Sequence, residues 1–301
     1  MTLSLKIKKW LVDYIAFRNK DYYTYQSRFL MPKINPQTPA FDKAVAGGGN
    51  RRINVAFGLD NNYWRFTGVA ITSLLAQSEG TCVYDIYCLV PPNFTQEAKW
   101  GLAGIVQRFS PESKITFIHV GDNNLRHRYP SPWAISSYYR LMLPAILPNV
   151  DKIIYADSDA IFCRDLASAD DIPLGQNLIA AVRDNTKGFV NSGFLIMNLR
   201  QMRQENTYPY FMGLLPYNFQ WPDQSILNIC CKGRILHLPW KYNFRPLLLV
   251  GELQNGTHTY SEYADLKDGV VFVHWCGPKP WNERGLLGHL WQKFADMSGL
   301  F

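Results

Sequence analysis

The sequence lacks the cysteine patterns of a disulfide-rich domain or a zinc site. None of its six cysteines forms a C-x-x-C pair, and two of them, Cys230 and Cys231, are adjacent in the chain. Adjacent cysteines suit neither a disulfide framework nor zinc coordination. The chain also shows no signal peptide pattern, so we expect a cytoplasmic protein with reduced thiols.

The signatures of several common enzyme classes are absent as well. There is no G-x-x-x-x-G-K-[ST] loop, no G-x-G-x-x-G fingerprint and no G-x-S-x-G elbow. These absences argue against nucleoside triphosphate hydrolysis, dinucleotide binding and serine hydrolase chemistry, respectively. The chain contains no internal repeat and no low-complexity segment. Apolar residues make up 47% of its 301 residues, which is enough for a sizeable core.

Positive charge is concentrated at the start of the chain. Residues 1–52 contain ten Lys or Arg and three Asp or Glu, a difference equal to the whole net charge of +7. The remainder is neutral, so nucleic acid is not an expected partner. We therefore predict a basic arm over residues 1–50, which ends in the Gly-rich joint 44–50, and a separate domain over residues 51–301.

The arm has the pattern of a short amphipathic helix. Apolar residues recur at helical spacing, and basic residues flank them: Ile7, Leu11, Tyr14 and Ile15, with Lys6, Lys8, Lys9 and Arg18. Asp13 interrupts the apolar run, which is too short to cross a bilayer. Such a helix can lie on an anionic membrane surface, or it can pack on the domain with its lysines in solvent. Both interpretations stay open.

The domain alternates strand-like and helix-like segments. Strands are predicted at 53–57, 83–90, 114–120, 152–156, 178–182, 192–199 and 270–274. Helices are predicted at 68–76, from 95 to before 111, and at 137–147, 223–231 and 286–297. This rhythm predicts an α/β fold with a mixed, largely parallel central sheet. Ligands of such sheets bind beyond the carboxyl ends of the strands, where Asp60 and Asp157 are expected.

A pair of acidic residues ends one predicted strand in the sequence YADSDAIF, residues 155–162. Side chains two positions apart on an extended chain share a face, so Asp157 and Asp159 can converge. Two like charges repel unless a cation lies between them. Divalent cations such as Mn²⁺ and Mg²⁺ prefer oxygen ligands and also bind phosphates. The alternative is a solvated turn in which Asp159 caps the following segment.

Other polar residues support the interpretation as a metal and nucleotide site. Asp60 and Asn62 follow the first predicted strand and suit the edge of a uracil or ribose. The sequence HWCGPKPW, residues 274–281, places an imidazole, a glycine turn and a lysine within six residues. Imidazole favours later transition metals, so His274 beside two carboxylates favours Mn²⁺ over Mg²⁺. Lys279 is placed to meet phosphate oxygens.

Six motifs together resemble glycosyltransferase family 8, and in particular its bacterial lipopolysaccharide core glucosyl- and galactosyltransferases. In order they are AFGLDNNY, SSYYRL, YADSDAIF, FVNSGFLIMNL, PDQSILN and HWCGPKPW, spread over residues 51–281. The resemblance implies a GT-A type, Rossmann-like nucleotide-sugar-binding fold, a UDP-hexose donor, Mn²⁺ dependence and retention of anomeric configuration. It also implies a saccharide acceptor, which we expect to be lipid-linked and at the inner face of the cytoplasmic membrane.

The resemblance also implies roles for individual residues. The metal ligands would be Asp157, Asp159 and His274, and Asp157 would also touch the ribose. Asp60 and Asn62 would hold the uridine, with Tyr63 beside the base. The phosphates and the donor sugar would be contacted by Arg140, Asp184, Asn191, Asp223, Gln224, Gly277 and Lys279. Gln224 occupies the position of a nucleophile, and Asp184 and Asp223 are the carboxylate candidates for that role.

Each of these residues also has an ordinary structural interpretation. Arg140 can pair with a carboxylate on a helix surface, and Asn191 can cap a turn. Asp223 follows a proline and can be a helix N-cap. His274 can be a hydrogen-bonded core histidine. Retention allows either two displacements or front-face attack, and we favour front-face attack in which the leaving phosphate takes the proton.

Two further functions remain alternatives. One is a self-glucosylating protein similar to glycogenin, which the 17 tyrosines would permit. The other is a nucleotide-sugar-binding protein without turnover. The intact pair of acidic residues argues against the second alternative.

Overall fold

The computed structural model of the chain describes most of the domain that follows the predicted arm. The described residues are 51–78, 82–121, 135–184, 189–217, 219–246, 269–282 and 287–301. The basic arm and the Gly-rich joint lie outside them, so the predicted division at residue 50 stays a prediction. None of the helices in the described part combines the length and hydrophobicity that a bilayer crossing requires.

The first half of the domain is a parallel β-α-β-α-β unit. Its elements are β1 (Arg51–Gly58), α3 (Trp64–Ala76), β2 (Cys82–Val90), α4 (Gln96–Phe109) and β3 (Lys114–His119). β2 lies between β1 and β3 and pairs with both in parallel. The chain then passes through the 3₁₀ helix η2 (Ile135–Met142) and the single turn α5 (Leu143–Ile146) into β4 (Lys152–Ala156), which returns to the other side of β1.

The second half extends the sheet and reverses one strand. Its elements are β5 (Ala160–Phe162), α6 (Ala167–Asp170), β6 (Ile179–Arg183), β7 (Val190–Asn198), α7 (Leu199–Gln204), α8 (Tyr208–Leu214), α9 (Pro222–Cys230), β8 (Ile235–Leu238), the 3₁₀ turn η3 (Trp240–Tyr242), β9 (Phe272–His274) and α11 (Gly288–Ser298). The seven-stranded sheet has the order β3-β2-β1-β4-β7-β6-β8. β7 runs antiparallel to both of its neighbours, so the sheet is mixed.

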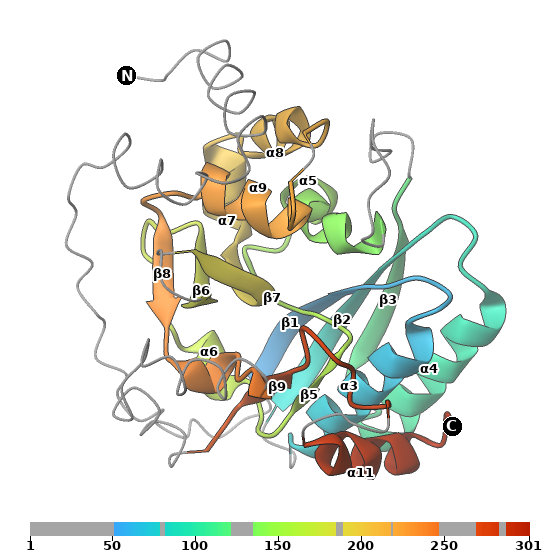
Figure 1. Cartoon of the computed structure of the whole chain (residues 1–301). Helices are drawn as coiled ribbons and strands as arrows, with labels where there is room; N and C mark the ends of the chain where they lie inside the picture. Colours follow the sequence, from blue (N-terminus) through green and yellow to red (C-terminus); the bar gives the residue numbers. More distant parts are fainter. Residues whose placement is uncertain are drawn as a thin grey trace.

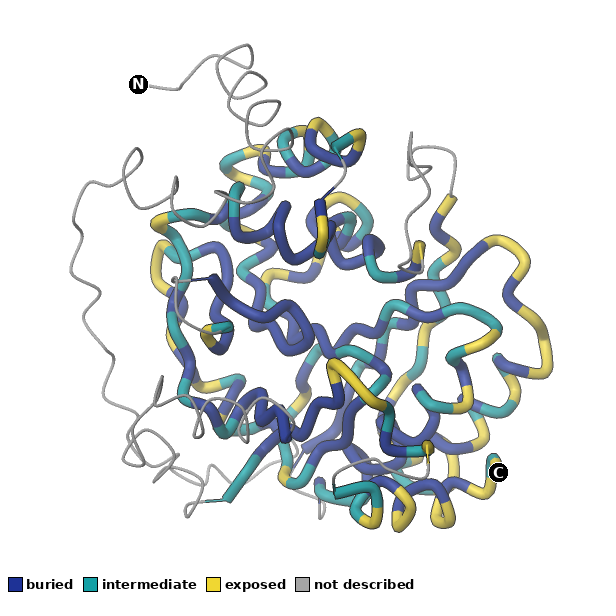
Figure 2. The backbone as a smooth tube through the Cα atoms, in the orientation of Figure 1, coloured by how far each residue is buried: buried dark blue, intermediate teal, exposed yellow. Residues whose placement is uncertain are grey.

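Helices cover both faces of this sheet, with α3 and α4 on one face and η2, α5 and α7–α9 on the other (Figure 1). The central strands alternate their side chains between the two layers: in β4, Ile154 packs with the α3 and α4 layer and Tyr155 with the opposite layer. Figure 2 shows the resulting band of buried backbone through the middle of the molecule. Burial on both faces explains why β4 and the central part of β7, residues 194–197, are continuously apolar after Lys152 and Gly193.

A second, two-stranded sheet joins segments that are far apart in the chain. β5 pairs antiparallel with β9, and Ala160 lies opposite His274. β5 also packs against α3 and α11. Because β5 follows β4 after only three residues, this pairing brings the end of β9 to the carboxyl edge of the main sheet.

Most of the predicted elements are confirmed, and the differences are local. The segment predicted as a helix over 137–147 is a 3₁₀ helix followed by one α-helical turn, with Pro144 at the start of that turn. The predicted strand at 270–274 is shorter, because β9 contains only Phe272–His274, and it belongs to the small sheet. The prediction of a mixed, largely parallel α/β sheet is confirmed.

Candidate active site at the carboxyl ends of the strands

The two aspartates of the Asp-Ser-Asp triplet occupy the bend between β4 and β5. The amide of Asp157 donates to the carbonyl of Gly193 on β7 at 2.9 Å, and the amide of Trp275 donates to the carbonyl of Asp159 at 3.0 Å. Ser158 is buried and its hydroxyl lies 2.7 Å from that of Thr67 on α3. The segment is a bend and not the extended chain that was predicted, but anchoring at all three residues still brings the two carboxylates together.

His274 joins the two aspartates through the pairing of β5 with β9. Its Nε2 lies 3.3 Å from Asp159 Oδ1 and 3.8 Å from Asp157 Oδ2. One ligand atom from each of the three residues lies within 4.8 Å of the other two. Two carboxylates and one imidazole are a donor set that suits a divalent transition metal. The three predicted metal ligands therefore meet, and they fit such an ion.

The two carboxylates sit in different electrostatic surroundings. Burial raises the pKa of Asp157, and the charge of Asp159 adds to this rise, whereas Arg140 opposes it. Burial would also raise the pKa of Asp159, but His274 and Lys279 outweigh burial and hold that pKa below its usual value. These cations therefore keep Asp159 ionised.

Lys279 supplies a positive charge on the other side of Asp159. Its ammonium group donates to Asp159 Oδ2 and, at 3.0 Å, to the carbonyl of Trp275. Burial would lower the pKa of Lys279, but Asp159 outweighs burial and raises it. Gly277 lies on the exposed part of the same turn. The turn thus places the cation of Lys279 at the carboxylate cluster, while Gly277 is exposed. The predicted contact of these two residues with a diphosphate stays a prediction.

Arg140 links Asp157 of the carboxylate cluster to the first turn of α9. Its Nη2 donates to Asp157 Oδ1 at 2.6 Å, and its Nε lies 3.2 Å from Asp223 Oδ2. Ser192 on β7 also donates to Asp223 Oδ2, at 2.9 Å. The N-cap of α9 is Trp221, so the interpretation of Asp223 as a helix N-cap is wrong. Arg140 pairs with the partly buried Asp157 and the buried Asp223, and not with a carboxylate on a helix surface.

A second group of polar side chains lies between β7 and α9. Gln224 Oε1 accepts from Asn191 Nδ2 at 3.1 Å, and Gln224 Nε2 donates to Asp184 Oδ2 at 2.9 Å. Asp184 is also paired with the buried guanidinium of Arg245. Asn191 lies inside β7 and not in a turn, although its Oδ1 accepts from the amide of Gly193 at 3.0 Å. All four residues predicted to line the sugar pocket therefore belong to connected hydrogen bonds.

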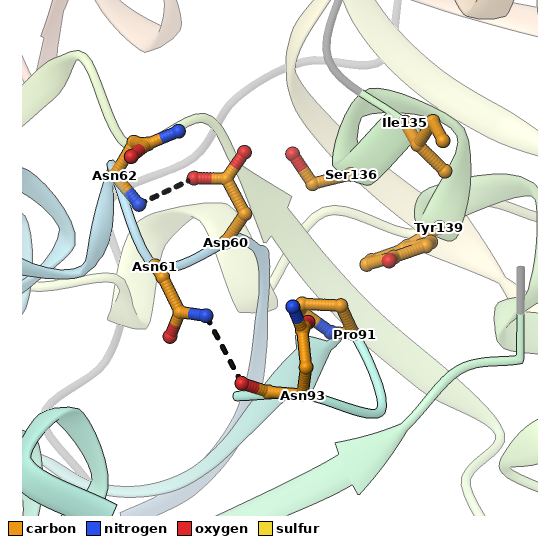
Figure 3. Close-up of a pocket in the computed structure, with 8 residues that line it drawn as sticks. All are labelled: Asp60, Asn61, Asn62, Pro91, Asn93, Ile135, Ser136 and Tyr139. Atoms are coloured by element: carbon orange, nitrogen blue, oxygen red, sulfur yellow. Dashed lines mark hydrogen bonds between the residues drawn. The ribbon is translucent and has the colours of Figure 1, made fainter. Parts of the chain in front are cut away.

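A cavity of about 390 Å³ opens at the carboxyl ends of β1 and β2. Figure 3 shows its lining, which comes from the loops after these strands and from η2: Asp60, Asn61, Asn62, Pro91, Asn93, Ile135, Ser136 and Tyr139. Asp60 Oδ1 accepts from the amide of Asn62 at 2.8 Å, and Asn61 Nδ2 donates to the carbonyl of Asn93 at 3.0 Å. These bonds hold the two loops around the cavity. Asp60 and Asn62 therefore lie at the strand edge where a nucleotide was predicted.

Tyr63 lies outside the lining of this cavity. Its ring is 5.5 Å from that of Phe66 and 6.3 Å from that of Trp281, measured between ring centroids. Burial raises the pKa of its hydroxyl. The predicted contact between Tyr63 and a base stays a prediction.

Several residues of the site were not predicted from the sequence. They are Ser192, Asn243 and Arg245 in the polar network and Ser136 and Tyr139 in the cavity. Asn243 Nδ2 donates to Asn191 Oδ1 at 2.7 Å, and Asn243 Oδ1 lies 3.1 Å from His274 Nδ1. The alternation of aromatic and polar residues in YNFR, residues 242–245, is a sequence signal that could have pointed to Asn243 and Arg245. In the structure, Phe244 of this segment forms a β-bridge with Val273 of β9.

Comparisons with known proteins agree with this geometry. The profile of the family described as Glycosyl transferase family 8 matches residues 54–285. The chain is 24% identical over 256 residues to a lipopolysaccharide 1,2-glucosyltransferase of Escherichia coli, covering 77% of this chain and 73% of that protein. It is 23% identical over 270 residues to a lipopolysaccharide 1,3-galactosyltransferase of Salmonella typhimurium, covering 78% of this chain and 74% of that protein.

A solved structure shows the same fold. The galactosyltransferase LgtC, in complex with donor and acceptor sugar analogs, matches with a TM-score of 0.70 at 24% identity. The match covers 82% of this chain and 95% of LgtC. The GT-A fold predicted from the sequence is confirmed.

Proposed function

This chain belongs to glycosyl transferase family 8, and we propose that it is a retaining, metal-dependent hexosyltransferase. The proposed reaction moves glucose or galactose from a UDP-sugar to a sugar of the lipopolysaccharide core. Two relatives whose names include lipopolysaccharide glucosyl- and galactosyltransferase activity support this choice of donor and acceptor. The observation that carries the proposal is the meeting of Asp157, Asp159 and His274 beside a cavity at the carboxyl edge of the sheet.

The proposed metal is Mn²⁺, with Mg²⁺ as the alternative. Asp157, Asp159 and His274 would hold it, and the imidazole favours manganese. When bound, such an ion neutralises the charge that develops on the leaving diphosphate. Lys279 lies on the same cluster and would contact the diphosphate oxygens from the Gly277 turn, where a fixed positive charge stabilises the transition state more than the ground state.

The cavity between the first two strands is the proposed uridine site. Asp60 and Asn62 line it and offer a carboxylate and an amide to the hydroxyl and amide groups of a nucleoside. Asp157 follows β4, the neighbour of β1 in the sheet. A nucleoside diphosphate that occupied the cavity would therefore extend toward the carboxylate cluster. This is the usual position of a ligand at the strand ends of an open α/β sheet.

The donor sugar would contact the polar group between β7 and α9. Both carboxylates of this group are engaged, Asp184 by Arg245 and Gln224, and Asp223 by Arg140 and Ser192. An engaged carboxylate is a poor nucleophile, and the amide of Gln224 is weaker still. We therefore favour front-face attack. The bond between the anomeric carbon and the phosphate oxygen breaks, the acceptor oxygen bonds to that carbon, and the acceptor proton passes to the leaving diphosphate.

The proposed function is tested with a panel of UDP-sugars incubated with the full chain and Mn²⁺, without any acceptor. We expect UDP release from UDP-glucose or UDP-galactose, loss of release when EDTA removes the metal, and little release from other UDP-sugars. Intact-mass analysis of the same samples separates the self-glucosylating alternative, because only self-transfer adds hexose to the protein. No release from any sugar, with or without Mn²⁺, would favour a binding protein instead.

A further inference from the structure

We propose that Asn243 is a positioning residue for His274 and that it fixes the proton of the imidazole on Nδ1, which leaves Nε2 for the metal. This inference rests on the proposed role of His274 as a metal ligand. Asn243 lies outside the Asp-Ser-Asp triplet and outside the HWCGPKPW turn. It is fully buried, and the direction of its side-chain hydrogen bonds to Asn191 and His274 can be deduced.

The deduction begins at backbone amides, which can only donate. The amide of Gly193 donates to Asn191 Oδ1 at 3.0 Å, so this atom of Asn191 is an oxygen. The other end of the same side chain is then Nδ2, and it donates to Gln224 Oε1 at 3.1 Å. Gln224 Oε1 also accepts from the amide of Ser192 at 3.2 Å. The orientations of both amide side chains are therefore consistent.

Asn243 continues this chain to the imidazole. Asn191 Oδ1 also accepts from Asn243 Nδ2 at 2.7 Å, so the remaining atom, Asn243 Oδ1, is the one that lies 3.1 Å from His274 Nδ1. A side-chain amide oxygen cannot donate. His274 Nδ1 must therefore carry a proton, and Nε2 is the nitrogen whose lone pair can bind a metal. Nε2 is also the nitrogen that lies beside Asp157 and Asp159.

The ring of His274 has little space around it, so its polar contacts determine how it is oriented. His274 is only 3% exposed, and an added Cβ at Gly193 would lie 2.1 Å from its Cε1. The ring thus packs directly on the backbone of β7, and a 180° flip would present a carbon to Asn243 Oδ1 in place of Nδ1. Such a flip would also move Nε2 away from Asp159 Oδ1, which lies 3.3 Å from it. Asn243 therefore selects the tautomer, and together with Asp159 it holds the orientation of the ring.

Residues that hydrogen-bond to the second ring nitrogen of a metal-binding histidine usually raise the affinity of the site for the metal. Their replacement typically lowers metal affinity by about 10- to 100-fold. We expect the same range for Asn243→Leu, which keeps a similar volume but removes both hydrogen bonds. Asn243→Asp is the conservative variant, because a carboxylate oxygen can still accept from His274 Nδ1 although it cannot donate to Asn191.

The matched control is Asn198→Ala. Asn198 caps α7 by accepting from the amide of Gln201, and it donates to the carbonyls of Gly175 and Asn177. Its replacement also removes several hydrogen bonds, but Asn198 lies at the opposite end of β7 from the site. We expect this variant to lose stability without any change in metal affinity.

Two measurements are made on the full chain and on each variant. The first is the dissociation constant for Mn²⁺ in the presence of UDP, from the electron paramagnetic resonance signal of free Mn²⁺. The second is a ¹H–¹⁵N spectrum of the metal-free, ¹⁵N-histidine-labelled protein, in which His274→Gln assigns the signals. We expect an exchange-protected Nδ1–H in the wild type and in Asn243→Asp. We expect loss of this signal and weaker Mn²⁺ binding in Asn243→Leu.

The possible outcomes separate this inference from the proposed function. If the wild type does not bind Mn²⁺, the proposed metal site is wrong. If the wild type binds Mn²⁺ and Asn243→Leu binds it within about twofold of the same affinity, the metal site stands and the role of Asn243 is wrong. Should Asn243→Leu fail to fold, the wild-type spectrum decides, because a His274 without a proton on Nδ1 overturns the inference directly.

Discussion

Arg140 donates to Asp157 at 2.6 Å from a side chain that is only 3% exposed. The two residues come from different elements, η2 and the end of β4, and the same guanidinium also lies against Asp223 at the start of α9. Burial would lower the pKa of Arg140, but the two carboxylates outweigh burial and raise it. One cation thus pairs with two acids and joins three elements at the strand ends.

This arrangement predicts a large loss of stability for Arg140→Met. The substitution keeps a long side chain but leaves the buried Asp223 and the partly buried Asp157 without their cation, and breaking a buried pair in this way costs about 3–5 kcal/mol. The free energy of unfolding, measured with urea, checks this value. The control is Arg65→Met, because Arg65 pairs with Glu97 on the surface and such pairs contribute at most about 1 kcal/mol. Equal losses in both variants would contradict the prediction.

Asp159 provides the sharpest test of the metal assignment. Asp159→Asn keeps the shape of the side chain but removes its charge, so we expect metal-dependent transfer to fall by at least ~100-fold, which corresponds to about 2.7 kcal/mol. We also expect a measurable loss of stability, because Lys279 would lose its anionic partner. The measurement is UDP release with Mn²⁺, compared with Asp151→Asn at an exposed position. Wild-type activity in Asp159→Asn would show that the metal is not bound there.

Most of the central sheet was predictable because its strands are buried on both faces. Runs such as KIIYA, residues 152–156, are continuously apolar, and turn residues separate them from the next element. Short elements carried too little signal: β5 has three residues and β8 has four. The segment over 137–147 is helical as predicted, but its apolar spacing does not distinguish a 3₁₀ helix from an α-helix.

The meeting of Asp157, Asp159 and His274 was predictable because two of them are two residues apart and the third lies in a recognisable motif. The supporting residues were not, since their roles depend on register between distant elements. Asn243 reaches His274 only because its segment runs along β9, where Phe244 forms a bridge with Val273. Arg245 is an isolated cation in the sequence, and its pairing with Asp184 spans 61 residues. No local pattern reveals such contacts.

Front-face attack predicts that no covalent sugar accumulates on the enzyme. Asp184 and Asp223 are both held by arginine side chains, which lowers the nucleophilicity of a carboxylate. The reaction with the preferred UDP-hexose is quenched within one turnover, and peptide mass analysis then searches for hexose on these two residues. We expect none in the wild type. A hexose on either carboxylate would replace front-face attack by a double displacement.

The basic arm predicts a salt-dependent interaction with anionic membranes. Two of the ten basic residues at the start of the chain, Arg51 and Arg52, belong to β1 and pair there with Asp170, Asp171 and Asp85. The remaining eight lie in residues 1–50 with three acidic residues, so the arm itself keeps a clear positive excess. Each basic residue near an anionic surface contributes about 1 kcal/mol at low salt. Together with the predicted apolar face, these contributions of the basic residues are sufficient for reversible binding to an anionic membrane.

Deletion of residues 1–45 tests this prediction. We expect the shortened chain to lose binding to vesicles that contain anionic lipid and to keep its rate of UDP-sugar hydrolysis, because the residues proposed to bind the donor all lie beyond residue 59. Neutral vesicles and high salt serve as controls, since both should abolish binding of the full chain by removing the electrostatic attraction. Unchanged vesicle binding after the deletion would assign the membrane contact to the domain, and the arm would then be a helix that packs on the domain with its lysines in solvent.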